Sequence, residues 1–113
     1  MGKSSIGETF GTRQKTRKHE VSATPLFKLG QVVCTPGSVQ LMNERGVDPN
    51  TLLLRHVHGD WGAVDAGTAR DNKNAVKTQY RVHSAYDLQG GGVIWIFTEF
   101  LGSITTILLP EEY

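Results

Sequence analysis

The chain of 113 residues has room for one domain of ordinary size, and a hydrophobic content of 38% is typical of a globular protein rather than a disordered one. The single cysteine, Cys34, excludes an internal disulfide and fits a reducing compartment. Because no apolar run approaches the roughly 20 residues that cross a bilayer and no hydrophobic signal core follows Met1, we expect a soluble cytoplasmic protein.

The net charge of +1 hides a difference between the N-terminus and the rest of the chain. Residues 1–24 carry five basic and two acidic side chains, a net charge of +3, whereas residues 25–113 carry seven basic and nine acidic ones, a net charge of −2. The first segment has few apolar groups, so we predict a disordered basic arm over 1–24 and a single domain over 25–113. The arm either binds phosphates or acidic surfaces non-specifically or only aids solubility, and its central cations are Arg13, Lys15, Arg17 and Lys18.

The folded part is expected to begin with a short strand or extended segment over residues 26–35 and a short helix after it. Threonine is a suitable N-cap, proline fits the first helical position, and a glycine after an arginine is typical of a helix end. The residues that carry these signals are Thr35, Pro36 and Gly46, with Val39 and Met42 as the expected buried stripe.

Two more helices are predicted before the chain changes period. Asp48 caps and Pro49 begins the second helix, and Gly59 ends it. Residues 65–78 indicate a weaker third helix. On the second helix the expected core face holds Leu53, Leu54 and Val57, with His56 near its boundary and Arg55 and His58 pointing away.

Alternating apolar and polar residues over 80–88 predict a strand with one solvated face, and Gln89–Gly92 predicts a hairpin turn. Residues 93–100 suit a central strand covered by helices, and residues 104–109 form a last strand that Pro110 ends. We therefore predict an α+β fold, in which a short N-terminal strand and two to three helices pack on a three-stranded antiparallel meander. The last strand would be a sheet edge able to pair with a second copy.

The most unusual chemistry of the chain lies in Leu52–Gly62. His56, His58 and Asp60 have a spacing that suits zinc or another borderline metal. Residues two apart on a helix point about 200° apart, so both imidazoles would reach one metal only from an extended segment. Because the caps predict a helix, we expect no metal site and no cofactor.

A second interpretation joins Arg55, His56, Asp60 and Glu99 in an acid–base cluster for hydrolysis or phosphodiester cleavage. In the structural alternative, Asp60 accepts hydrogen bonds from nearby amides, while Arg55 or His56 caps helix carbonyls and locks the turn. No nucleophile or phosphate-cradling loop accompanies these residues, which favours the structural alternative. Trp61 is expected to fold back over the apolar stripe of the helix.

Cys34 and the aromatic residues have similar pairs of interpretations. Cys34 stands at a helix start, which lowers a thiol pKa, but without a second cysteine or a base we expect a small buried residue. Tyr80, Tyr86, Trp95 and Phe97 could form a stacking platform for single-stranded nucleic acid. Their inward alternation instead predicts that most of them belong to the core.

Residues 26–113 resemble a family of small bacterial proteins carried on plasmids and integrative elements, often called plasmid-related and sometimes described as a type I restriction endonuclease subunit. The resemblance rests on FKLGQVVCTPGSVQLM, LLLRHVHGDWG, RVHSAY, IWIFTE and TTILLPEEY. It implies work in plasmid maintenance, transfer control or interference with host defence. The matching positions are Arg55, His56, Gly59, Asp60, Trp61, Gly62, Asn72, Ser84, Tyr86, Trp95, Thr98, Glu99, Thr105, Thr106, Pro110, Glu111, Glu112 and Tyr113.

The chain departs from this family at charged positions. Relatives commonly have an acidic pair where this chain has Gly67-Thr68, and an acid followed by arginine where it has Leu101-Gly102. His58 is not part of the family pattern. These losses weaken any catalytic scheme that needs the missing charges.

We therefore predict a non-enzymatic binding protein that serves a mobile element as an accessory or anti-defence factor. Its expected partner is a host or element-encoded protein, or a protein–nucleic-acid complex. We do not expect it to bind a membrane. One alternative is a small hydrolase or nuclease centred on His56 and Asp60 with Glu99. Another is a nucleic-acid-binding protein that uses the basic arm. The predicted binding residues are Arg55, His56, Asp60, Trp61 and Glu99.

Overall fold

The computed structural model describes residues 21–113, the side chain of Phe100 excepted, so Arg13, Lys15, Arg17 and Lys18 of the predicted arm lie outside the described residues. In the described part of the chain, no helix is both long and apolar enough to cross a membrane. The elements are β1 (Gln31–Cys34), α1 (Pro36–Arg45), α2 (Pro49–Val57), α3 (Ala66–Thr78), β2 (Val82–Asp87), β3 (Val93–Thr98) and β4 (Ile104–Leu108), with short 3-10 helices η2 (Phe100–Gly102) and η3 (Pro110–Glu112).

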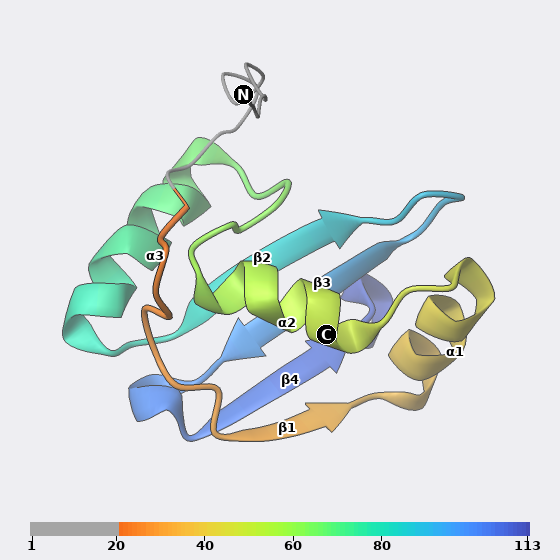
Figure 1. Ribbon diagram of the computed structural model, residues 1–113, viewed down its shortest axis with the longest axis horizontal. Helices are drawn as coiled ribbons and strands as arrows, with labels where there is room; N and C mark the ends of the chain where they lie inside the picture. Colours follow the sequence, from red (N-terminus) through yellow and green to blue (C-terminus); the bar gives the residue numbers. More distant parts are fainter. Residues whose placement is uncertain (1–20) are drawn as a thin grey trace.

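The four strands form one mixed sheet in the order β1-β4-β3-β2 (Figure 1). The predicted antiparallel meander is present as β2, β3 and β4, but the prediction of a three-stranded sheet was wrong, because β1 pairs in parallel with β4. Strand 104–109 was also wrongly expected at an edge, since β4 lies between β1 and β3. Pairing of the first strand with the last has no local sequence signal.

The helices begin where the sequence predicts. The side chain of Thr35 accepts a hydrogen bond from the Ser38 amide at 3.2 Å, and Asp48 caps α2. Asp65 caps α3 by accepting from the Thr68 amide at 2.7 Å. Helix α2 crosses one face of the sheet, with α1 beyond the end of β1 and α3 beside β2 (Figure 1).

The core has two parts. The larger one joins α1 and α2 to the sheet through Met42, Leu52, Leu53, Tyr86, Leu88, Ile94, Ile96 and Ile107. The smaller one lies against α3 and contains Trp61, Val64, Ala75, Val82 and Ala85.

Three predictions of burial were wrong. Leu54 has 59% of its surface exposed, because α2 buries the neighbouring Leu53 and Val57 on its other side. Val39 is exposed and Ser38 takes its place in the core, where its hydroxyl donates to the Ile107 carbonyl at 3.0 Å. Cys34 is exposed because it ends the edge strand β1.

Candidate functional site: a polar corner and the α3 groove

His56, a residue of α2, is fully buried where the helix packs on the sheet, and its ring begins a chain of hydrogen-bonded hydroxyl groups. Its Nδ1 lies 2.6 Å from Ser84 Oγ on β2, and its Nε2 lies 2.9 Å from Thr98 Oγ1 on β3. Thr98 Oγ1 is 2.7 Å from Thr105 Oγ1 on β4, and the Thr105 hydroxyl donates to the Leu29 carbonyl at 2.6 Å. The chain thus links a helix, three strands and the segment before β1.

The carbonyl at the end of this chain fixes the direction of every hydrogen bond. Because the Leu29 carbonyl only accepts, the Thr105 hydroxyl donates to it and accepts from Thr98. Thr98 must then accept from His56 Nε2–H, which leaves Nδ1 to accept from the Ser84 hydroxyl. The neutral Nε2–H tautomer of His56 satisfies the whole chain.

The surroundings of His56 keep it neutral. Burial, with a smaller contribution from the charge of His83, lowers the pKa of His56 to about 3. The prediction that His56 lies near the boundary of the helix face was wrong. The hydroxyl groups that surround His56 come from three strands far away in the sequence. The spacing of apolar residues along one helix therefore cannot predict its burial.

Arg55 and Asp60 lock the turn after α2. Arg55 Nε lies 2.7 Å from Asp60 Oδ2, and Nη2 lies 3.3 Å from Oδ1. The Tyr86 hydroxyl donates to the Asp60 carbonyl at 2.6 Å, and the Arg55 guanidinium lies 4.5 Å from the centre of the Tyr86 ring. Burial lowers the pKa of Arg55, but the hydrogen bond and charge of Asp60 outweigh it, so that the net effect is a raised pKa.

The predicted structural alternative describes this turn in part. Asp60 accepts from the Gly62 amide at 3.3 Å, as expected. Arg55, however, binds Asp60 rather than a helix carbonyl, and the ring of His58 is the one that lies 2.7 Å from the Leu54 carbonyl oxygen. We call His56, Ser84, Thr98, Thr105 and the Arg55–Asp60 pair the polar corner.

The predicted acid–base cluster forms only in part, because Arg55 and Asp60 pair with each other while His56 and Glu99 bind other partners. Glu99 pairs with Arg81 at 3.2 Å, while Asp60 pairs with Arg55 and His56 with two hydroxyls. The Ser84–His56 contact has the geometry of a nucleophile and its base, but both residues are 0% exposed. In the described chain, no three His, Cys, Asp or Glu side chains are placed to hold a metal ion.

The turn and α3 also seal the outer edge of β2. Asn72 donates to the His83 carbonyl at 2.6 Å and accepts from the His83 amide at 3.0 Å, as a neighbouring strand would. Ala85 bonds in the same way to the backbone of Trp61 and Ala63. Gly62 has a φ of 74°, and a Cβ there would collide with the Ala85 carbonyl, so this close approach requires glycine.

The aromatic residues do not form one platform. Trp61 is buried with Val64 and Ala75 in the smaller core, so the prediction that it covers the α2 stripe was wrong. Tyr86 is in the main core, whereas Tyr80 is exposed. The expectation that most of these rings are internal holds only in part, because Tyr86 and Phe97 are buried but Trp95 is only partly buried. Phe97 contacts both Trp95 and Tyr113, with ring centres 5.9 and 5.2 Å apart.

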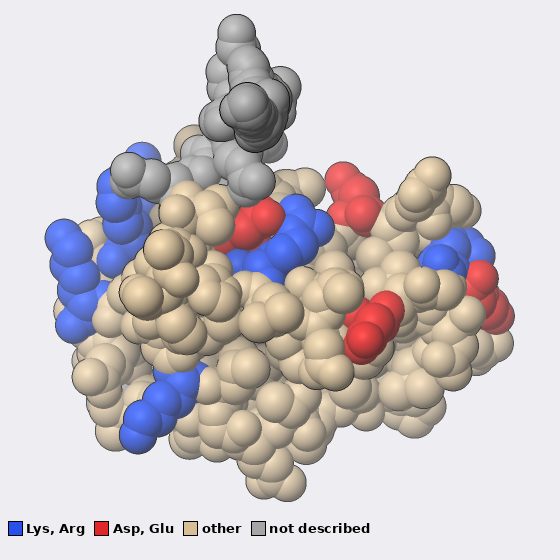
Figure 2. Space-filling view, in the orientation of Figure 1, with Lys and Arg blue, Asp and Glu red and all other residues tan. Residues whose placement is uncertain are grey.

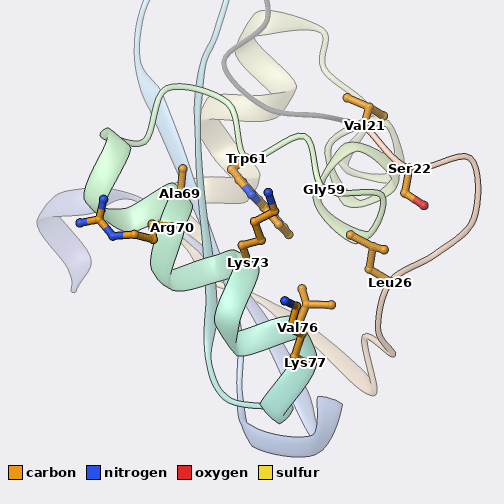
Figure 3. A pocket seen from close by; sticks show the side chains of 10 residues that line it. All are labelled: Val21, Ser22, Leu26, Gly59, Trp61, Ala69, Arg70, Lys73, Val76 and Lys77. Atoms are coloured by element: carbon orange, nitrogen blue, oxygen red, sulfur yellow. The ribbon is translucent and has the colours of Figure 1, made fainter.

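Beside the polar corner lies a groove of about 730 Å³, which we call the α3 groove (Figure 3). One wall of the groove is α3. The other wall is formed by the segment from Val21 to Leu26, which precedes β1. The Ser22 amide donates to the His58 carbonyl and the Leu26 amide to the Val57 carbonyl, at 2.8 Å each. These hydrogen bonds fix the segment to the C-terminal end of α2. The lining residues are Val21, Ser22, Leu26, Gly59, Trp61, Ala69, Arg70, Lys73, Val76 and Lys77.

The α3 groove combines an apolar lining with a row of cations. Arg70, Lys73 and Lys77 are spaced three and four apart, so they share one face of α3. Lys73 projects toward the opposite wall, whereas Arg70 extends along the outer flank of the helix (Figure 3). Lysine and arginine side chains gather on this side of the molecule (Figure 2).

Lys73 and Lys77 make no ion pair shorter than 4 Å with any of residues 21–113. The pKa of Asp65 is lowered by hydrogen bonds from Thr68 and, to a smaller extent, by the charge of Arg70. Within residues 21–113, the ion pairs shorter than 4 Å join Arg55 to Asp60 and Arg81 to Glu99. Among the described residues, no acidic side chain lines the groove. Sequence reasoning missed this site, although the helical spacing of the three cations beside Ala69 and Val76 was available to it.

The fold and the site define a small α+β protein in which His56 and its hydroxyl partners are internal, whereas the α3 groove, which is both basic and apolar, is open to solvent. Comparison with protein-family models, with curated proteins and with solved structures gave no match.

Proposed function

We propose that this protein is a non-enzymatic binding protein that acts by attaching to another macromolecule. The observation that carries the proposal is the contrast in access between its two polar regions. His56 and its hydroxyl partners are internal, whereas the α3 groove presents cations and apolar side chains to solvent. Accessible apolar surface beside unpaired charge is typical of recognition sites.

The geometry gives the hydrolase alternative little support. A general base needs to reach the proton that it removes, and His56 already uses both ring nitrogens inside the core. Its depressed pKa also makes it a weak base at neutral pH. Asp60 is held by Arg55, and Glu99 by Arg81.

The resemblance to plasmid-related proteins suggests the setting of this function. We propose that the protein is an accessory or anti-defence factor of a mobile element, and that its partner is a host or element-encoded protein, alone or with nucleic acid. The predicted role of the Arg55–Gly62 turn in binding becomes mainly indirect, because it supplies Gly59 and Trp61 to the groove. Arg55, with 45% of its side chain exposed, is the most exposed of the predicted binding residues in this turn.

Affinity capture of partners by the full-length chain from a bacterial lysate, read by mass spectrometry and nucleic-acid staining, tests the proposal. We expect a stoichiometric macromolecule that Asp60→Asn still recovers, because that change keeps the groove. In parallel, the purified protein is incubated with a phosphodiester, an ester and single-stranded DNA. Multiple turnover that Asp60→Asn abolishes at an unchanged melting temperature would overturn the proposal in favour of the enzyme.

A further inference from the structure

We infer that the α3 groove docks an acidic, amphipathic segment of a partner protein. This inference rests on the binding function proposed above and names the chemistry of the partner. Its first support is charge. The three cations on one face of α3 span about 10 Å along the helix, at 1.5 Å per residue, and Lys73 and Lys77 have no ion-pair partner in residues 21–113. Carboxylates with helical spacing on a partner would match this row.

Its second support is the apolar lining of the groove. Val21 and Leu26 are large hydrophobic residues that remain exposed on one wall. Val76 and Ala69 on α3 face the same space, and the Trp61 ring lies between the two walls (Figure 3). A partner that brought charge alone would leave these side chains in water, so the matching segment also carries apolar residues.

Two other possible occupants of the α3 groove match its lining less well. Residues 1–20 join the described chain at Val21, on the groove wall, but they carry five basic and two acidic side chains. Like charge therefore opposes their binding in the groove. A nucleic acid would use the cations, but its sugar–phosphate backbone would leave the apolar side chains of the groove in water.

The test uses the full-length protein and a defined probe. The probe is a fluorescein-labelled helical peptide of 16 residues with glutamates spaced three and four apart and leucines on the adjacent face. A second peptide keeps the leucines but replaces the glutamates with lysines, a third keeps the glutamates but replaces the leucines with serines, and single-stranded DNA is the fourth probe. Binding is followed by fluorescence anisotropy, and the contact surface is mapped by amide NMR shifts.

The protein variants are Lys73→Glu and its matched control Lys28→Glu, which reverses one exposed lysine that is not part of the groove lining. We expect the acidic amphipathic peptide to bind with shifts along α3 and at the Trp61 indole. Lys73→Glu should weaken this binding about tenfold and Lys28→Glu less than twofold, since one charge reversal at close range alters affinity by about one order of magnitude. Lys73→Glu should in turn improve binding of the lysine peptide.

Three results would overturn the inference. They are equal binding by Lys73→Glu and Lys28→Glu, equal binding of the peptides with and without leucines, and DNA binding tighter than peptide binding that Lys73→Glu abolishes. Failure here differs from failure of the proposed function. If the lysate partner is still captured by Lys73→Glu, the groove assignment is wrong and the binding function stands, whereas turnover by the isolated protein would refute the function itself.

Discussion

The polar corner and the α3 groove lie next to each other, yet they use their polar residues in opposite ways. In the corner, His56 forms hydrogen bonds with Ser84 and Thr98 inside the protein. In the groove, Lys73 and Lys77 are exposed and form no ion pair with any of residues 21–113. A histidine in contact with hydroxyl groups has the geometry of a catalytic pair. At full burial, however, it is a structural group whose hydrogen bonds have to be satisfied.

The positions on which the predicted resemblance to plasmid-related proteins rests have a structural explanation in this fold. They include His56, Asn72, Ser84, Thr98 and Thr105, all of which hold the corner or the β2 edge together. A pattern made of such residues follows from the fold. It does not by itself indicate a shared reaction.

The largest expected effect separates the two regions by stability. His56→Ala should lower the free energy of unfolding by about 4 kcal/mol, because it opens a cavity and leaves Ser84 and Thr98 without their partner. Lys73→Ala, in the groove, should change it by less than about 0.5 kcal/mol. Urea denaturation of both variants measures the difference, and a loss below about 1.5 kcal/mol for His56→Ala would show that the corner is not a structural centre.

The next effect is a pH dependence of stability that the burial of His56 should produce. The pKa of His56 is about 3 in the folded protein and 6.5 when unperturbed, so between these values the unfolded chain binds a proton that the folded one excludes. Stability should therefore be full above pH 6.5 and fall by about 3 kcal/mol between pH 6.5 and pH 4.

His56→Gln serves as the control for this pH dependence, because it removes the titrating group. The pKa of His83 is also lowered by burial and by Arg81, and this contribution persists in both proteins. The difference between the two stability profiles isolates His56. Parallel profiles over this range would contradict a buried neutral imidazole.

A smaller effect is expected at the sealed edge of β2. Asn72→Ala removes both hydrogen bonds to the His83 backbone and leaves a buried amide and carbonyl without partners, so stability should fall by about 2 kcal/mol. Asn74→Ala, two residues along the same helix and exposed, should have an effect below about 0.5 kcal/mol. Thermal unfolding of the pair tests whether α3 supports the sheet through this side chain.

The smallest effect belongs to the part of the corner that solvent reaches. Asp60→Asn removes the charge that faces Arg55, but the side chains are 17% and 45% exposed, so screening limits the loss to about 0.5–1 kcal/mol. The loss should shrink in 1 M salt. Asp71→Asn, an exposed acid on α3, is the reference. A loss as large as that of His56→Ala would show that the ion pair, and not the histidine, organises the corner.

Local signals predicted the helices well. Thr35, Asp48 and Asp65 accept hydrogen bonds from amides two or three residues ahead, so each helix start is decided within one turn of chain. The β2–β3 hairpin was equally readable, because a run of glycines separates two apolar strands. Burial was less predictable: Leu54 and Val39 lie beside core residues in the sequence but on the outer side of their helices.

By itself, then, the sequence determined where the helices begin and which segments contain strands, and that Arg55 and Asp60 would lie near one turn. Only the tertiary structure decided that His56 is internal, because its partners Ser84 and Thr98 are 28 and 42 residues away. It alone also placed β1 beside β4 and closed the α3 groove with the segment at Val21. Propensities and caps act within a few residues, whereas strand partners, buried hydrogen bonds and grooves are set by segments that meet only when the chain has packed.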